Sequence, residues 1–220
     1  MSITARHEGL FDGTASYTFH MLGCGAIGSS AALQLARMGG INFHLYDYDK
    51  VEDVNIGIAQ YTINDIDKDK TSALKGHILS INPQAIVDEH NEEFKELFYQ
   101  DKLDIVILGF DSMKARMDAV THICSNPTTR PECIIDGRMG AEHYQQYIIT
   151  KPTLTKYKKV WYPDDDSNEE PCNAKATGYC SNMSGSFIAN AVRKFITNSP
   201  LNNNFSFNFP TMMLIKETVR

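Results

Sequence analysis

The chain has 220 residues, a formal net charge of -6 and 42% hydrophobic residues. This length suits one domain with an appendage, and the composition excludes a disordered or fibrous protein. The negative charge predicts no nucleic-acid partner, and the apolar runs are only strand-sized, which predicts no membrane segment. Five cysteines, an odd number, and no basic start followed by a long apolar run favour a cytoplasmic location.

The first half of the chain alternates between predicted strands and helices. Residues 17–22 predict a buried strand, and the glycines that follow it lead into an apolar helix that ends at Gly39. Residues 41–46 predict the next strand, residues 68–80 a helix, and residues 85–89 a third strand. This alternation predicts parallel strands joined by helices.

A continuous apolar run at residues 103–108 is typical of a central parallel strand, and Asp111 follows its carboxyl end. Residues 114–125 predict a helix. Residues 133–135 predict a short strand that ends at Asp136, Gly137 and Arg138.

We therefore expect an α/β fold with a doubly wound, Rossmann-like, mainly parallel sheet, in which residues 1–140 form a nucleotide-binding domain. Residues 141–220 predict a short carboxyl-terminal α+β lobe, packed on the same domain. Its expected elements are strands at 144–150 and 205–209 and an amphipathic helix at 184–197. An acidic segment bracketed by prolines, residues 163–171, predicts a solvated crossover.

A glycine-rich loop lies between the first predicted strand and helix, with glycines at Gly23, Gly25 and Gly28. In this context such a loop lets the backbone approach phosphates and directs a helix amino-terminus at them. Asp47 ends the second strand 19 residues after Gly28, where a carboxylate accepts hydrogen bonds from ribose hydroxyls, and Asp49 is a second candidate. Both NAD and ATP fit this pattern.

The order of polar residues after the second strand resembles the ThiF/MoeB branch of the ubiquitin-activating-enzyme-like adenylyltransferases. That family carries an aspartate pair, a valine-glutamate step, an asparagine, a glutamine and a lysine, matched here by Asp47, Asp49, Val51, Glu52, Asn55, Gln60 and Lys70. Further on, Asp111 and Arg116 resemble the family's strand-end aspartate and downstream arginine. The resemblance covers residues 6 to 140.

This resemblance implies an enzyme that uses ATP and Mg²⁺ to adenylate a carboxylate and releases pyrophosphate. Lys70 would offer positive charge to the phosphates, Asp111 would hold Mg²⁺, and Asn55 and Gln60 would orient phosphate or ribose. An attacking carboxylate is already ionised, so no protein base is needed, and the seven histidines show no ligand or triad spacing. The implied acceptor is the carboxyl terminus of a ubiquitin-like, sulfur-carrier or ribosomal peptide substrate, and the implied assembly is a homodimer.

The chain departs from the family pattern at the arginine that precedes the glutamine, because Ala59 stands there. Arg6, Arg116 or Arg138 could replace that arginine, and Arg138 is our preferred candidate. Arg6 would serve a partner's site, as an amino-terminal arginine does in related dimers.

The cysteines raise two further questions. The chain has no CxxC pair, so we expect no zinc. Cys172 follows the acidic crossover, where some relatives place a cysteine that accepts the acyl group as a thioester, and it is a candidate nucleophile. Cys180 is a weaker one.

Two other functions stay open. An NAD(P)-dependent oxidoreductase would use the same glycine loop but leaves Lys70, Asp111 and Arg116 without a role. A catalytically reduced nucleotide-binding or scaffold subunit of an activating enzyme would explain the missing arginine, but it has no need of Lys70 and Asp111.

Overall fold

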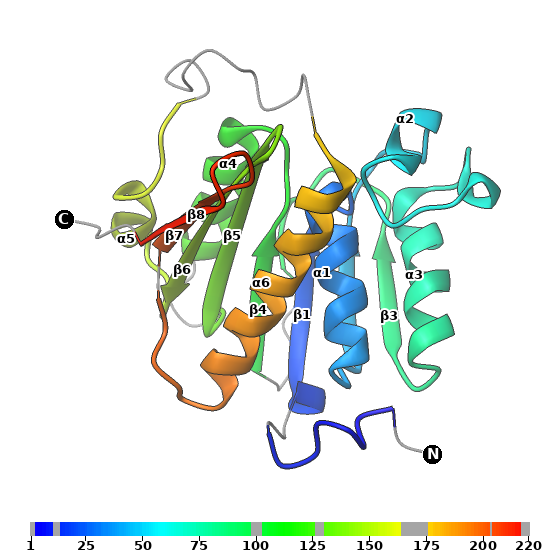
Figure 1. The fold of residues 1–220 in the computed structure, drawn as a ribbon, viewed down its shortest axis with the longest axis horizontal. Coiled ribbons are helices and arrows are strands. Elements are labelled where there is room, and N and C mark those ends of the chain that lie inside the picture. The colour runs from blue at the N-terminus through cyan, green and yellow to red at the C-terminus, as the bar shows by residue number, and fades with distance from the viewer. Residues whose placement is uncertain are drawn as a thin grey trace.

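Eight strands form one sheet in the order β3-β2-β1-β4-β5-β6-β7-β8 (Figure 1). The computed structural model describes residues 3–10, 14–97, 103–125, 130–163, 176–202 and 204–216. The strands are β1 Tyr17–Leu22, β2 Asn42–Tyr46, β3 Ile86–His90, β4 Leu103–Leu108, β5 Cys133–Gly140, β6 His143–Thr150, β7 Asn204–Asn208 and β8 Met213–Lys216. Strands β1 to β5 pair in parallel and β6 to β8 are antiparallel. The strand order reverses beside β1.

Helices cover both faces of the sheet. They are α1 Ala26–Arg37, α2 Asp53–Ile56, α3 Lys70–Ile81, α4 Met113–Ser125, α5 Leu154–Lys158 and α6 Gly178–Ile196, with 3-10 turns at Thr14–Ser16 and Ile63–Asp65. Helices α1, α3 and α6 pack on the face toward the viewer in Figure 1, and α4 and α5 pack on the opposite face. None of the helices in the described ranges has the length and apolar character to cross a bilayer.

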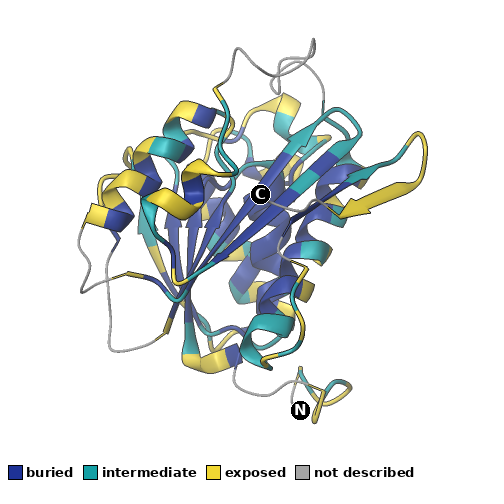
Figure 2. Cartoon of the chain, turned by 90° about the vertical axis from the view of Figure 1, so that its left-hand side faces the viewer, coloured by how far each residue is buried: buried dark blue, intermediate teal, exposed yellow. Residues whose placement is uncertain are grey.

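The core has two layers because successive side chains of a strand point to opposite faces. Ile105 and Ile107 of β4 join the cluster beneath α1, α3 and α6, whereas Val106 and Leu108 join the cluster beneath α4 and α5. Burial on both faces explains the continuous apolar run at residues 103–108. The central strands are accordingly buried in Figure 2, whereas β3 and β8, at the two edges of the sheet, carry exposed residues.

The predicted α/β class and its doubly wound, mainly parallel sheet are confirmed. The elements of the first half lie where the sequence predicts them, but β5 continues to Gly140 instead of ending near Ile135. Arg138 therefore lies within the strand and not at its end. The short elements α2, α5 and β8 were not predicted.

The sheet continues across residue 140, because β5 and β6 pair from Cys133 with Thr150 to Gly140 with His143. Of the predicted acidic crossover, residues 163–171, only Pro163 lies within the described residues.

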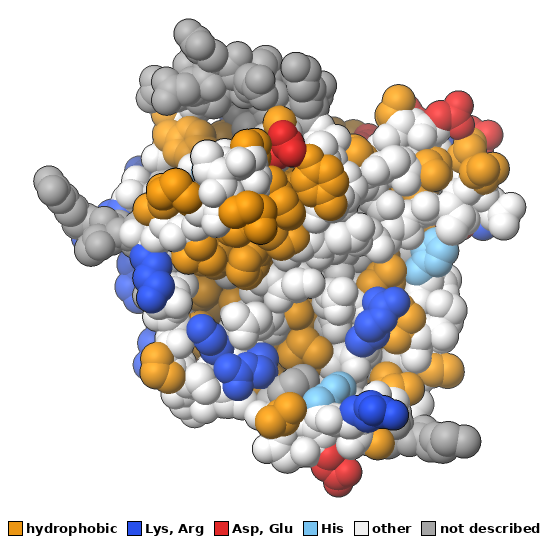
Figure 3. All heavy atoms as spheres, viewed as in Figure 1, with side chains coloured by type: hydrophobic (Ala, Val, Ile, Leu, Met, Phe, Trp, Pro, Cys, Tyr) orange, Lys and Arg blue, Asp and Glu red, His pale blue; other side chains and the backbone are white. Residues whose placement is uncertain are grey.

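The β7–β8 end of the sheet carries an apolar surface, visible at the upper left of Figure 3. Met212 and the β8 residues Met213, Leu214 and Ile215 are exposed. Beside them, the Phe209 ring contacts those of Tyr179 and Phe207, with centroids 4.8 and 5.0 Å apart. Apolar patches on a monomer surface are typical of protein contacts.

Helices α1 and α6 pack closely because small residues meet between them. A Cβ atom added to Gly185 of α6 would lie 2.3 Å from the Ser30 Oγ atom and 2.6 Å from its carbonyl carbon. The Ser181 hydroxyl donates to the Ala26 carbonyl at 2.8 Å. Helix α1, which follows the glycine loop, is thus packed against α6 on its outer side.

We expect Gly185→Ala to lower the free energy of unfolding by about 1–3 kcal/mol, because the new methyl group forces the two helices apart. The control is Gly76→Ala in α3, where an added Cβ meets nothing within 4 Å. There the better helix propensity of alanine should raise stability by about 0.5–1 kcal/mol. Urea unfolding measures both changes, and a gain in stability for Gly185→Ala would contradict this account of the packing.

Candidate functional site

A cavity of about 490 Å³ opens at the carboxyl ends of β1, β2 and β4. Its volume lies within the range of roughly 300–1,000 Å³ found for small-molecule sites. Doubly wound sheets bind ligands at this position, where the strand order reverses. The predicted site residues that line the cavity are Gly23, Gly25, Asp47, Asp49, Lys70 and Asp111.

The three glycines of the loop have different roles. Gly23 has a φ of +92°, and an added Cβ would lie 2.8 Å from the Gly109 carbonyl carbon, so the turn requires glycine. A Cβ at Gly28 would lie 1.9 Å from the Gly23 carbonyl oxygen, so Gly28 allows close packing of α1 on the loop. Gly25 precedes α1 and lines the cavity, and an added Cβ there would meet no other atom within 4 Å. The amino-terminus of α1 has no side-chain cap and begins at this open position.

Asp47 is held in place by the backbone around it. Its Oδ2 atom accepts a hydrogen bond from the Cys24 amide at 2.7 Å, and its Oδ1 atom accepts one from the Asp49 amide at 2.9 Å. Burial raises the pKa of Asp47, while the Lys70 charge and these hydrogen bonds oppose that rise. The carboxylate is therefore fixed at the end of β2, facing the cavity.

Lys70 is a fixed cation at the cavity. It is the first residue of α3, its side chain is 11% exposed, and its Nζ atom donates to Asp49 Oδ2 at 2.7 Å. Burial by itself would lower the pKa of Lys70, but the charges of Asp47 and Asp49 outweigh it and raise the pKa above its ordinary value. The ammonium group consequently stays charged at neutral pH.

Asp111 lies in a loop of residues 109–112 between β4 and α4, called the Asp111 loop below. Its side chain is exposed, lines the cavity and makes no hydrogen bond or ion pair with another described residue. In the parts of the chain that the structure describes, no group of three or more His, Cys, Asp or Glu side chains is arranged to hold a metal ion. The assignment of Mg²⁺ to Asp111 stays a prediction.

Asn55 and Gln60 are not among the residues that line the cavity. The Asn55 Oδ1 atom accepts from the Glu52 amide at 2.9 Å in a capping box at α2. The Gln60 Nε2 atom donates to Asn182 Oδ1 at 2.7 Å, on α6. The Asn55 side chain thus caps the helix in which it lies, and the Gln60 side chain joins its connecting segment to α6. Contact of either side chain with a nucleotide stays a prediction.

Arg138 is placed differently from our expectation. Its guanidinium is buried and donates to Asp136 Oδ2 from Nε at 3.0 Å and from Nη2 at 2.7 Å. Arg116, also buried, donates to the other carboxylate oxygen of Asp136. Neither arginine lines the cavity. Because β5 continues through position 138, this side chain lies in the protein interior, and its role in place of the missing family arginine stays a prediction.

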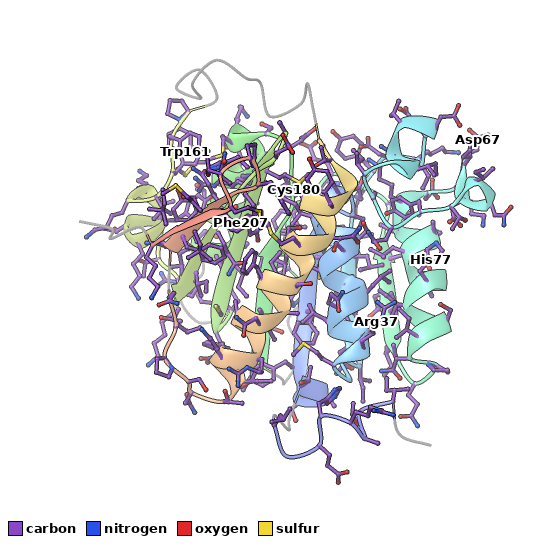
Figure 4. All side chains as sticks on the ribbon, viewed as in Figure 1. Arg37, Asp67, His77, Trp161, Cys180 and Phe207 are labelled. Atoms are coloured by element: carbon purple, nitrogen blue, oxygen red, sulfur yellow. The ribbon has the colours of Figure 1, made fainter. Side chains whose placement is uncertain are left out.

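Arg6 and Cys180 are not among the residues that line the cavity. The segment that carries Arg6 lies at the opposite end of the sheet in Figure 1, so Arg6 could serve only a partner's site, and that role stays a prediction. Cys172 lies outside the described residues. Cys180, labelled in Figure 4, is buried in the first turn of α6, and burial raises the pKa of its thiol to about 11. A thiol in this state is a poor nucleophile.

Several lining residues were not predicted. They are Tyr46, Tyr48, Glu92, Glu93, Phe94, Gly109, Phe110, Ser112, Lys114, Ala115, Asp118, Ala119 and His122. Their position at or after the ends of β2, β3 and β4 is the signal that could have found them, because ligands bind beyond the carboxyl ends of such strands. Taken together, the lining holds six carboxylate side chains and two lysines.

Tyr46 connects the cavity wall to a stack of histidines on β1, β2 and β3. Its ring centroid lies 4.3 Å from that of His90, and the rings of His20 and His44 stack at 4.9 Å. Burial lowers the pKa of His44 to about 4, so its imidazole is neutral at pH 7. The rings of His20, His44 and His90 pack as an aromatic stack behind the cavity.

The doubly wound sheet, the glycine loop and the cavity at the strand-order reversal define an α/β protein built to bind a nucleotide. The family model of the ThiF family matches residues 9–220. The chain therefore belongs to the ThiF family, and the match includes the carboxyl-terminal region that our resemblance left out.

Curated relatives match part of this chain. Ubiquitin-like modifier-activating enzyme 5 of Caenorhabditis briggsae is 29% identical over 139 residues, which cover 57% of this chain and 31% of that protein. The enzyme of the same name from Dictyostelium discoideum is 32% identical over 119 residues, 47% of this chain and 31% of that one. The matched part spans about a third of the length of these relatives.

Solved structures match nearly the whole chain. Escherichia coli MccB with ATP has a TM-score of 0.72 at 18% identity, covering 92% of this chain and 64% of that one. MccB with MccA-N7isoASN also has a TM-score of 0.72 at 18% identity, with 94% and 65% covered. PaaA has a TM-score of 0.70 at 19% identity, with 94% and 64% covered. At these identities the similarity establishes the fold alone.

Proposed function

We propose that this chain binds Mg²⁺-ATP in the cavity and adenylates a carboxylate. The observation that carries the proposal is that the uncapped amino-terminus of α1, at Gly25, faces the same cavity as the buried cation Lys70 and the fixed carboxylate Asp47. A helix amino-terminus and a lysine bind phosphate oxygens, and a carboxylate at the end of the second strand accepts ribose hydroxyls. That E. coli MccB, with the same fold, was solved with ATP supports the choice of nucleotide.

In the proposed reaction an oxygen of the substrate carboxylate attacks the α-phosphorus of ATP. The bond between the α-phosphorus and its bridging oxygen breaks, pyrophosphate leaves with the electron pair, and an acyl-adenylate remains. Lys70 and the α1 amides would stabilise the charge that develops on the phosphates. Mg²⁺, held by Asp111, would neutralise further phosphate charge.

The charge of the cavity supports a requirement for a cation. Six carboxylates against two lysines repel a free nucleotide, so ATP should enter this site together with its metal ion. Asp111 fits this role because its carboxylate is exposed to the cavity and free of partners among the described residues.

As substrate we propose a protein or peptide with an accessible carboxyl terminus. The names of the curated relatives, which are activating enzymes for ubiquitin-like modifiers, support this class, and so does the structure of MccB with MccA-N7isoASN. We retain a homodimer as part of the proposal, in which the exposed Arg6 of one protomer could reach the cavity of the other.

One observation favours a second function, a nucleotide-binding subunit without catalysis. No arginine of the described ranges lines the cavity, although the family pattern places one before Gln60, where the buried Ala59 stands. Such a subunit would bind Mg²⁺-ATP without releasing pyrophosphate. Pyrophosphate release with a pool of peptides that have free carboxyl termini separates the two functions.

We expect Asp111→Asn to weaken Mg²⁺-ATP binding by about 10- to 100-fold, because losing a charged metal ligand costs roughly 1.5–3 kcal/mol. Calorimetric titration with ATP at several Mg²⁺ concentrations measures the change, and the loss should shrink as Mg²⁺ is raised. The control is Asp118→Asn, a carboxylate of the same cavity that is 55% exposed and paired with Lys114. If both variants bind Mg²⁺-ATP as the wild type does, Asp111 is not the metal ligand.

A further inference from the structure

A buried ion network lies directly behind the Asp111 loop. Asp136 is fully buried between Arg116 and Arg138, and the Tyr157 hydroxyl donates to it at 3.0 Å. Arg116 also donates to the backbone, from Nη1 to the Leu108 carbonyl at 3.3 Å and from Nη2 to the Phe110 carbonyl. The network therefore fixes the backbone on which Asp111 stands.

The same network holds residues 160–162, a short segment called the strap below. Arg138 donates from Nη1 to the Val160 carbonyl at 2.9 Å, and its guanidinium lies 4.9 Å from the Tyr162 ring centroid. Within the strap, Trp161 donates from Nε1 to the Met113 carbonyl at 2.8 Å. Met113 begins α4 one residue after the Asp111 loop. Trp161 is labelled at the upper left of Figure 4.

We propose that Trp161 is a positioning residue for the metal-nucleotide site, which it serves by fixing the start of α4 and with it the Asp111 loop. The proposal rests on the function proposed above. On its other side the loop is fixed by the end of β1, because the Gly109 amide donates to the Leu22 carbonyl at 2.7 Å. The Asp111 loop is thus held between the end of β1 and the strap.

The physical reason lies in how Asp111 is supported. Its own side chain has no partner among the described residues, so its direction depends on the backbone of the loop. Side chains donate hydrogen bonds to the carbonyls of Leu108, Phe110 and Met113, and Trp161 supplies one of these three side-chain hydrogen bonds. Groups that orient a metal ligand commonly change metal affinity by about 10- to 100-fold when they are lost.

The test uses Trp161→Phe, which keeps an aromatic ring in the same apolar contacts but removes the N–H donor. The matched control is Tyr162→Phe, which removes the hydrogen bond from the neighbouring strap residue to Gln145 Oε1 at 3.1 Å, a group of β6 and not of the loop. At fixed ATP, the Mg²⁺ concentration that gives half-maximal nucleotide binding should rise roughly 3- to 10-fold for Trp161→Phe. For Tyr162→Phe it should stay within about twofold.

A double-mutant cycle separates positioning from general stability. If Trp161 acts through Asp111, adding Trp161→Phe to Asp111→Asn should leave the Mg²⁺ dependence of the single Asp111→Asn variant unchanged. A further rise of the same size in the double variant would overturn the proposal, because the two residues would then act independently.

Wild-type protein offers a second readout, since Trp161 is the only tryptophan of the chain. Its fluorescence should change on titration with Mg²⁺-ATP, with the same midpoint as calorimetric binding. Binding without a fluorescence change, or unchanged Mg²⁺ dependence in Trp161→Phe, would overturn the positioning role and leave the proposed function intact. If the wild type shows no Mg²⁺-dependent ATP binding, the proposed function fails and this inference fails with it.

Discussion

Replacing Lys70 with alanine should weaken Mg²⁺-ATP binding by about 10- to 100-fold, since a charge-assisted contact to phosphate contributes roughly 1.5–3 kcal/mol. Pyrophosphate release should fall further, by about 100- to 1,000-fold, if the ammonium group stabilises charge that grows in the transition state. The variant also leaves Asp47 and Asp49 in the cavity without their cation. Calorimetry and pyrophosphate release with the peptide pool measure the two effects.

Lys114→Ala is the matched control for Lys70→Ala. Lys114 lines the same cavity, but its side chain is 83% exposed and paired with Asp118 on the surface of α4. We expect both measurements to stay within about threefold of the wild type, because exposed ion pairs contribute roughly 0.2–1 kcal/mol. Equal losses in the two variants would show that the cavity needs positive charge in general, and would remove the specific role of Lys70.

Replacing Asp136 with asparagine should lower the free energy of unfolding by about 3–5 kcal/mol, because two buried guanidinium groups then lack their counter-charge. Burial alone would raise the pKa of Asp136, but Arg138 and Arg116 outweigh it and hold the pKa below its ordinary value. The stability from this carboxylate is therefore fully present above the unfolded-state pKa of about 3.8, and is lost as the pH falls through the lower folded-state pKa.

Urea unfolding at pH 7 tests the role of Asp136, with Asp118→Asn as the surface control. Asp118 is 55% exposed and should contribute less than about 1 kcal/mol. An Asp136→Asn variant as stable as Asp118→Asn would mean that water or rearranged side chains satisfy the two arginines. The buried network would then not fix the Asp111 loop as described.

The parallel half of the sheet is predictable because its physical signals are local. A strand buried on both faces leaves a continuous apolar run, as in residues 103–108, and a glycine loop between strand and helix marks the first crossover. Asp47, Lys70 and Asp111 follow strand ends or begin a helix, and the topology brings such positions together at one edge. This much of the candidate site follows from sequence order.

The polar interior is not predictable in this way, because its partners are distant in sequence. Arg138 binds Asp136 two residues before it, but the rest of the buried network comes from Arg116 of α4, Tyr157 of α5 and the Val160 carbonyl. A charged pair in a strand has the same local composition as a charged turn, which is why β5 was predicted to end too early. Gln60 is a similar case, since its partner Asn182 lies 122 residues away.

The packing of α6 on α1 has a consequence for biosynthesis. Helix α1, which follows the glycine loop, is synthesised early. The side of α1 that carries Ala26 and Ser30 is covered only after the ribosome has synthesised α6. Strand β1 likewise pairs with β4, its second neighbour in the sheet, only after β4 has been synthesised. Until then the nascent chain exposes apolar surface and open strand edges, which are features that chaperones recognise and that promote aggregation.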